Sequence, residues 1–257
     1  MGLMGAIVLM CRLVRWSCGL GCVLIASATA NAETVNVAVA MNFKTVLEKL
    51  EPIFEGQSGH DLVISSGSTG KLFAQIRYGA PYDVFLAADE ARPERLESLG
   101  AGVAGSRFSY AIGRLVLWSP NGEDVGPEIL ASDGFRHIAI ANPELAPYGA
   151  AAMDVLSALG QLDNVRDRIV YGQNVGQAFA LAATGNAELG FVAKSQMLDF
   201  EPDRQAGDWW EPSQALYTPI RQDAVLLKDR PAAHAFMAFL KSDDAKRIIT
   251  DSGYSAP

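Results

Sequence analysis

The amino-acid sequence predicts an α/β fold made of two units, each with a mostly parallel sheet flanked by helices. Short apolar runs of strand length alternate along the chain with segments whose apolar residues recur at helical spacing. The alternation starts again near residue 113, so that the second part of the chain repeats the pattern of the first. Such a β-α-β-α-β order is typical of parallel, doubly wound sheets.

The first unit is predicted to contain strands and helices in strict alternation. The strands are short runs dominated by Val, Ile, Leu and Ala, and they are expected at 34–40, 61–67 and 83–89. The helices are expected at 43–54, 71–78 and 93–99. Pro93 would occupy the first turn of the last helix, where proline is favoured.

The second unit repeats this alternation and is followed by a tail. Its strands are expected at 114–119, 137–142, 168–172 and 189–194. Its helices are expected at 150–160 and 175–184, and Gly160 stands where a glycine commonly ends a helix. A further strand at 224–228 and one or two helices within 232–254 form a tail that can return to the first unit.

The first 32 residues have the three parts of a secretory signal peptide. Arg12 and Arg15 precede a short apolar run, and residues 30–32 (Ala-Asn-Ala) form a small-residue cleavage site. We therefore expect cleavage after Ala32 and a periplasmic location for the mature chain. A retained N-terminal anchor is the alternative, and Cys22 leaves lipid modification of the leader open.

The composition argues against several kinds of partner. All three cysteines (Cys11, Cys18 and Cys22) fall in the leader, so the mature chain must rely on its core rather than on disulfides. The net charge of −8 and the lack of any basic run argue against nucleic acid or an anionic membrane as partner. An anionic ligand would have to be bound by local dipoles.

The sequence contains no recognisable catalytic constellation, and we expect that the protein is not an enzyme. Its three histidines are scattered without metal-ligand spacing, and the G-x-S-x-G motif is absent. The stretch GSTGK resembles a phosphate loop, but Ser65 stands where a Walker A motif needs glycine, and Leu72 follows the lysine. A secreted α/β enzyme remains the alternative of a different class.

Four of the predicted strands end in loops that are rich in small or amide side chains and lead into a helix. These loops contain Asn42, Ser68-Thr69, residues 142–149 and residues 173–177. Helix N-termini have unpaired N–H groups and a partial positive charge, so they bind anions without a formal cation. Ordinary capping of the following helix is enough to explain the small or amide residues of any one of these loops. Four such loops at strand exits, where α/β sheets bind their ligands, predict an oxyanion site.

Six segments occur in a distinctive order: VAVAMNF, SSGSTGKLFAQI, GAPYDVFLAAD, IANPELAPYGAAA, YGQNVGQAFALAATGNAELGFV and FLKSDDAKRIITDSGY. In this order they closely resemble the periplasmic molybdate-binding proteins of ABC importers, over nearly the whole mature chain. The resemblance implies a two-lobed periplasmic-binding-protein fold of type II, with the ligand cleft between the lobes. One lobe would comprise 33–112 and 220–257, and the other 113–219.

The resemblance also implies the ligand and the residues that bind it. The ligand would be a tetrahedral dianion, molybdate or tungstate, held by N–H groups, hydroxyls or amides. Carried over by position, the binding residues are Asn42, Ser68, Thr69, Tyr148 and Val175. Asn42 would donate through its side chain or its N–H, the Ser68-Thr69 pair through a hydroxyl and an N–H, and Tyr148 and Val175 through their N–H groups. The resemblance further implies a monomer without a cofactor or a direct metal ligand, which delivers its ligand to the membrane permease subunits of an ABC importer.

Some questions stay open at the level of sequence. Asn42 stands where some family members have serine, and Ala193 stands where some have a tyrosine donor. The donor loops offer no well-placed carboxylate for the proton that phosphate keeps, which disfavours phosphate. Sulfate and molybdate agree in charge and shape, so only pocket size separates them. The pair Trp209-Trp210 is either a docking patch or part of the packing.

Overall fold

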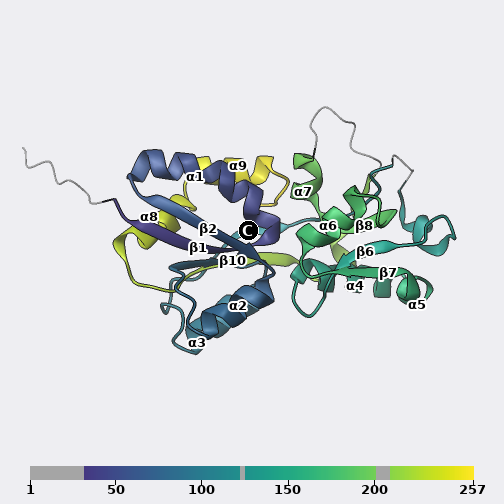
Figure 1. Ribbon diagram of the computed structural model, residues 1–257, viewed down its shortest axis with the longest axis horizontal. Coiled ribbons are helices and arrows are strands. Elements are labelled where there is room, and N and C mark those ends of the chain that lie inside the picture. Colours follow the sequence, from purple (N-terminus) through teal and green to yellow (C-terminus); the bar gives the residue numbers. More distant parts are fainter. Residues whose placement is uncertain (1–31, 122–124, 201–208) are drawn as a thin grey trace, which may run out of the picture. The chain divides into compact units, whose positions relative to one another are not determined.

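Two five-stranded sheets and their covering helices make up the computed structural model, which describes residues 32–121, 125–200 and 209–257 (Figure 1). The predicted signal peptide lies outside the described residues, apart from Ala32. Among the described helices, none is both long enough and apolar enough to cross a membrane.

The first sheet has the strand order β2-β1-β3-β10-β4. Its strands are β1 (Thr34–Ala40), β2 (Asp61–Gly67), β3 (Val84–Leu86), β4 (Phe108–Gly113) and β10 (Ile220–Leu226). Strand β1 lies between β2 and β3 and runs parallel to both, and its Val37 pairs with Ile64 on one side and Val84 on the other. β10 runs antiparallel to both β3 and β4.

The second sheet has the strand order β7-β6-β8-β5-β9. Its strands are β5 (Leu115–Trp118), β6 (Ile138–Ala141), β7 (Ile169–Gly172), β8 (Leu189–Ala193) and β9 (Trp209–Trp210). β6 is parallel to β7 and β8, whereas β5 is antiparallel to β8 and β9.

The predicted α/β architecture is confirmed, and both sheets are mixed. In each sheet two strand pairings are parallel and two are antiparallel. The antiparallel strands lie next to the two passages of the chain between the sheets, at 113–115 and 211–219. In each sheet only one strand opposes the other four, β10 in the first and β5 in the second. The chain enters each of these two strands from the other sheet, and not through a helical crossover within the same sheet, which is what makes strands parallel.

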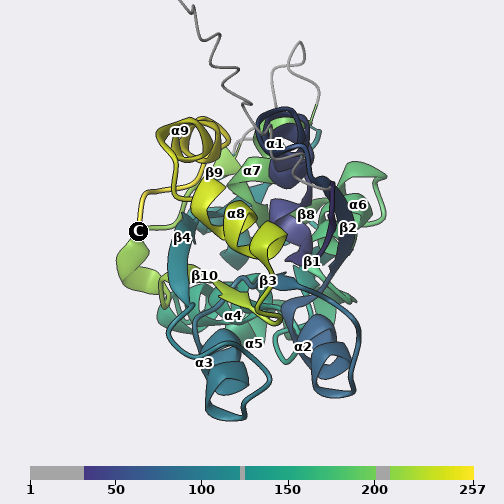
Figure 2. The ribbon, with the colours of Figure 1, turned by 90° about the vertical axis from the view of Figure 1, so that its left-hand side faces the viewer.

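Helices cover both faces of the first sheet (Figure 2). One face carries α1 (Lys44–Ser58), α8 (Pro231–Phe239) and α9 (Asp243–Asp251), and the other carries α2 (Thr69–Arg77) and α3 (Ala91–Ser98). In β1, Val35, Val37 and Val39 pack on the first group, whereas Ala38 packs on the second. Because both faces are buried, β1 is apolar almost throughout.

The second sheet is covered in the same way. Its helices are α4 (Pro147–Ala158), α5 (Leu162–Val165), α6 (Val175–Ala183) and α7 (Lys194–Asp199). Short 3-10 helices are η1 (Met41–Phe43), η2 (Pro127–Ala131), η3 (Arg166–Arg168) and η4 (Gln214–Leu216). In the tryptophan pair that forms β9, Trp210 packs against the core and Trp209 is 37% exposed. Packing thus accounts for Trp210.

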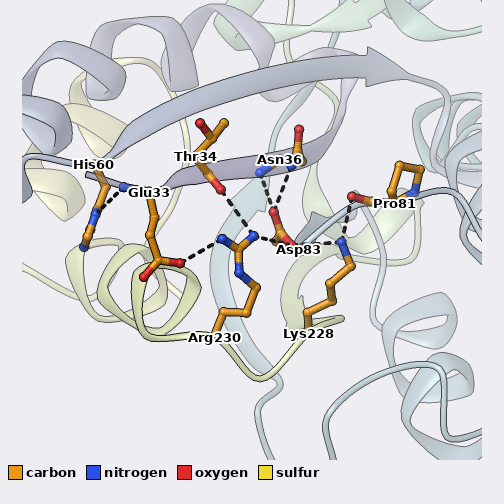
Figure 3. A network of polar contacts seen from close by, with 8 residues as sticks. All are labelled: Glu33, Thr34, Asn36, His60, Pro81, Asp83, Lys228 and Arg230. Atoms are coloured by element: carbon orange, nitrogen blue, oxygen red, sulfur yellow. Dashed lines mark hydrogen bonds and ion pairs between the residues drawn. The ribbon is translucent and has the colours of Figure 1, made fainter. Parts of the chain in front are cut away.

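A buried carboxylate joins the start of β1 to the segment between β10 and α8 (Figure 3). Asp83, which is fully buried, accepts hydrogen bonds from the Asn36 N–H at 2.7 Å and from Lys228 Nζ at 3.1 Å. Arg230 Nη1 lies 3.2 Å from the same carboxylate, and its Nη2 bonds to Glu33 at 2.7 Å. The role of Asp83 here is structural.

Candidate oxyanion site

All five residues that the sequence analysis assigned to the ligand line one small cavity. These residues are Asn42, Ser68, Thr69, Tyr148 and Val175. The first three follow strands of the first sheet, and the other two begin helices beside the second sheet. The cavity has a volume of about 10 Å³, which is room for a single water-sized group.

Helix N-termini supply the backbone donors of this cavity. Thr69 and Val175 are the first residues of α2 and α6, and Tyr148 is the second residue of α4. The N–H groups of a first turn have no acceptor inside their own helix. Within the described part of the chain, no other residue accepts a hydrogen bond from these three N–H groups. They are therefore available to an anion.

Two hydroxyl groups have a free hydrogen at the same place. Ser68 Oγ caps α2 by accepting from the Lys71 N–H at 3.4 Å, so the capping interpretation holds for this oxygen. Thr69 Oγ1 accepts from the Ala88 N–H at 3.2 Å. Neither hydroxyl donates to another described residue, so both can donate to a ligand.

The side chain of Asn42 is engaged away from the cavity. Its Nδ2 donates to Gln222 Oε1 at 2.9 Å and to the Tyr254 hydroxyl at 3.0 Å. Both hydrogens of the amide nitrogen are thereby used. Of the two donors that the sequence analysis considered for Asn42, this arrangement leaves the backbone N–H in the first turn of η1.

The lining of the cavity is neutral. None of its lining residues carries a charged side chain, and Glu144, the acid nearest to the donors in the sequence, is exposed. A much larger hollow of about 550 Å³ lies next to the cavity and shares Ala88 and Pro147 with it. Four carboxylates line that hollow, those of Asp89, Glu90, Glu94 and Asp154. They outnumber its two guanidinium groups, those of Arg92 and Arg221, and this excess of negative charge disfavours an anion there.

No metal site accompanies this cavity in the part of the chain that the structure describes. Among the described residues, no three His, Cys, Asp or Glu side chains are arranged so that they could hold a metal ion. The donors instead fit a ligand that accepts hydrogen bonds and gives none. Ala193 ends β8 and provides no side-chain donor.

A buried polar network that the sequence analysis missed lies directly behind the cavity. Its members are Tyr110, Tyr148, Ser195, Gln222 and Tyr254, together with Asn42. Tyr254 donates to the Asn42 carbonyl at 2.7 Å and accepts from Ser195 Oγ at 3.1 Å. One signal was present in the sequence: the polar residues Gln222 and Asp223 stand directly before the apolar run at 224–227, and both are buried in β10.

Burial keeps the phenols of this network neutral. Desolvation raises the pKa of Tyr110 and Tyr148 well above the ordinary value of 10. It raises the pKa of Tyr254 to about 12, although hydrogen bonds from Ser195 and Asn42 oppose the shift. These phenols therefore carry no negative charge at neutral pH.

These tyrosines should limit the stability of the fold in alkali. Because the pKa of Tyr254 is about 12 in the folded chain and near 10 when unfolded, its contribution is complete below pH 10 and is lost as the pH rises towards 12. We expect the buried phenols to ionise only together with unfolding. Tyrosinate absorbance and circular dichroism, recorded side by side, test this. Ionisation of all seven tyrosines with an intact fold would contradict it.

Several contacts connect the two sides of the cavity. The Gly70 N–H donates to the Leu145 carbonyl at 2.9 Å, and Arg92 Nη2 donates to the Glu144 carbonyl at 3.0 Å. On another edge, Lys49 Nζ bonds to Asp199 at 2.7 Å. The first partner of each pair belongs to the part of the chain around the first sheet, and the second to the part around the second sheet.

Known proteins share both the sequence and the fold. The chain matches the family described as bacterial extracellular solute-binding protein over residues 35–255. It is 47% identical over 247 residues to the molybdate-binding protein ModA of Azotobacter vinelandii, covering 94% of this chain and 97% of that protein. ModA of Rhodobacter capsulatus is 43% identical over 230 residues, which are 88% of this chain and 89% of that protein.

A solved structure agrees with these sequence matches. The periplasmic molybdate-binding protein of Azotobacter vinelandii aligns with a TM-score of 0.82 at 46% identity. The alignment covers 87% of this chain and 99% of that protein.

Proposed function

Because the chain belongs to the bacterial extracellular solute-binding proteins, we propose that it captures molybdate outside the cytoplasmic membrane and delivers it to an ABC importer. The observation that carries this proposal is a single cavity in which five neutral donor residues converge without any carboxylate. Tungstate has the same charge and shape and is proposed as a second ligand. The protein binds its ligand without a chemical step.

The proposed binding mode uses backbone and hydroxyl donors only. The N–H groups of Asn42, Thr69, Tyr148 and Val175 and the hydroxyls of Ser68 and Thr69 bond to the oxygens of the dianion. Molybdate is fully deprotonated near neutral pH, so it accepts each of these bonds. The partial positive charge at the ends of α2, α4 and α6 adds to the attraction.

Binding is proposed to close two lobes around the ligand. One lobe comprises 33–112 and 220–257, the other 113–219, and the two passages of the chain between the sheets form the hinge. Since the cavity has room for only one water-sized group, a tetrahedral oxyanion must move its walls apart on entry. Donors from both lobes then bond the same ligand, so that binding favours the closed state.

Export follows from the same proposal. Residues 1–32 are proposed to act as a signal peptide that is removed after Ala32, and the mature monomer then meets the permease subunits of its importer. A mature protein that begins at Glu33, found in the periplasmic fraction by mass spectrometry, would support this. Retention of residues 1–32 at the membrane would contradict it.

Calorimetry on purified residues 33–257 tests the ligand. Molybdate, tungstate, sulfate and phosphate are titrated in turn, and the melting temperature is recorded with each anion. Tight binding of molybdate and tungstate without a response to sulfate is expected. Binding of sulfate instead would keep the anion site and change the cargo, because the neutral donors suit either dianion. No response to any anion would overturn the proposal.

Substituting Gly70 with alanine should weaken binding by obstructing closure. A Cβ at this position would lie 3.1 Å from the Leu145 carbonyl oxygen and 3.2 Å from Leu145 Cα, both backbone atoms. We expect about tenfold weaker molybdate binding, or about 1.4 kcal/mol. The melting temperature of the unliganded protein should not fall, because alanine favours a helix more than glycine does.

Gly56→Ala is the matched control for this substitution. Gly56 lies in α1, and a Cβ there meets nothing within 4 Å. This variant should bind molybdate as the unmodified protein does. Equal affinity of both glycine variants would show that the contact between Gly70 and Leu145 does not limit binding.

A further inference from the structure

The side chain of Gln222 joins two of the proposed ligand-binding residues from behind the cavity. Gln222 lies on β10 and is fully buried. Its Oε1 accepts from Asn42 Nδ2 at 2.9 Å, and its Nε2 donates to the Tyr148 hydroxyl at 3.3 Å. Asn42 belongs to one proposed lobe and Tyr148 to the other, so one amide bonds to both.

The bonding pattern fixes the orientation of this amide. The Tyr110 hydroxyl also lies 3.0 Å from Oε1, and its single hydrogen is shared between this oxygen and the Ala87 carbonyl, likewise at 3.0 Å. If the amide were turned over, Nε2 would face the amide nitrogen of Asn42, and two donors would oppose each other. The present orientation satisfies both ends of the amide. Asn42 is held in turn by Tyr254, which accepts from its Nδ2 and donates to its carbonyl.

Tyr148 reaches from the cavity to the passage between the sheets. Its backbone lines the cavity, while its hydroxyl lies above Gly113, where β4 ends. A Cβ on Gly113 would lie 2.3 Å from that hydroxyl and 2.6 Å from Gln222 Nε2. The Tyr148 hydroxyl and Gln222 Nε2 therefore fill the space beside Gly113, next to the proposed hinge. Only a glycine at position 113 leaves room for both groups.

We propose that Gln222 is a positioning residue of the oxyanion site. It holds the loops of Asn42 and Tyr148 so that their N–H groups converge on one ligand, although Gln222 itself does not line the cavity. This inference rests on the proposed function, since it concerns how the same site is assembled. The proposed site would then depend on a residue of β10, although its donors come from other elements.

A double-mutant cycle tests the proposal with Gln222→Met, Tyr148→Phe and the double variant. Methionine is unbranched and of similar length but makes no comparable hydrogen bond. Phenylalanine removes the hydroxyl and leaves the backbone N–H in place. Each single variant should bind molybdate about tenfold more weakly. The double variant should bind molybdate about as weakly as Gln222→Met does, because both changes break the same hydrogen bond between Gln222 and Tyr148.

Tyr217→Phe serves as the matched control. It also removes a buried hydroxyl, which accepts from the Leu115 N–H at 3.5 Å and has no bond to the cavity residues. This control should keep full affinity even if its melting temperature falls. If Gln222 only stabilised the fold, Gln222→Met would lower the melting temperature and leave the affinity for molybdate unchanged.

Amide hydrogen exchange without added anion provides a second readout. Gln222→Met should speed exchange together in two segments, at the hydrogen-bonded N–H group of Lys44 and at that of Gly149, while Tyr217→Phe should change neither segment. Full molybdate affinity in folded Gln222→Met, fully additive effects in the double variant, or unchanged exchange in both segments would each overturn the inference. Because exchange needs no ligand, its result separates failure of this inference from failure of the proposed function.

Discussion

Replacing Val175 with proline is expected to weaken molybdate binding by about tenfold to a hundredfold, the effect of one lost hydrogen bond to a charged group. Val175 is the first residue of α6 and lines the cavity. Proline removes its N–H, yet its fixed φ suits the first helical position. Asn174 is already extended, with φ −151° and ψ 173°, as the residue before a proline prefers.

Val175→Ala separates the lost donor from lost packing. Val175 is buried, so both variants lose valine contacts, but alanine keeps the N–H. We expect Val175→Ala to bind molybdate within about twofold of the unmodified protein, since it loses no charge-assisted bond. Calorimetry gives the affinities, and circular dichroism checks that the helices remain. If the proline variant bound as tightly as the alanine variant, the Val175 N–H would not be a ligand.

The helix starts that carry the candidate donors were predictable because neighbouring residues determine them. Ser68 and Asn174 mark helix starts in the sequence, and both cap their helices in the structure. Strand β2 ends directly before Ser68, and β7 ends two residues before Asn174. The type of each element and the position of its end follow from neighbouring residues, and a parallel arrangement brings such ends to one edge.

The network behind the site was not predictable in this way. Asn42 meets Gln222 across 180 positions and Tyr254 across 212. No local pattern carries information over such separations. The sequence analysis therefore considered the Asn42 side chain as a donor to the ligand, whereas the fold gives both hydrogens of that amide to the network.

Strand β4 and the antiparallel direction of β10 were not predictable for a related reason. Residues 108–113 were not predicted as a strand, because Ser109 and Tyr110 interrupt the apolar pattern. Both side chains bond to β10, to Asp223 and Gln222 respectively, so they are polar for a reason that lies 112 or more positions away. Likewise, the apolar character of β10 predicts a buried strand but not its antiparallel direction.

Replacing Asp83 with alanine is expected to lower the free energy of unfolding by about 3 kcal/mol, the lower end for breaking a buried ion pair. The lower end applies because Lys228 and Arg230 are 43% and 37% exposed and can turn to water. The Asn36 N–H loses its only bond in the described structure. Asp163→Ala, in an exposed pair with Arg166, is the control and should change stability by less than about 0.5 kcal/mol.

The difference between Asp83→Ala and the unmodified protein should depend on pH in a defined direction. Burial raises the pKa of the Asp83 carboxyl, but the bonds from Asn36 and Lys228 outweigh this, so its pKa lies below the ordinary 3.8. The stabilisation is therefore present above pH 3.8 and is lost as the pH falls below it. Urea unfolding at neutral and acid pH measures both effects. Because Asp83 does not line the cavity, the folded variant should keep its affinity for molybdate, and equal stability at neutral pH would contradict the structural role of this carboxylate.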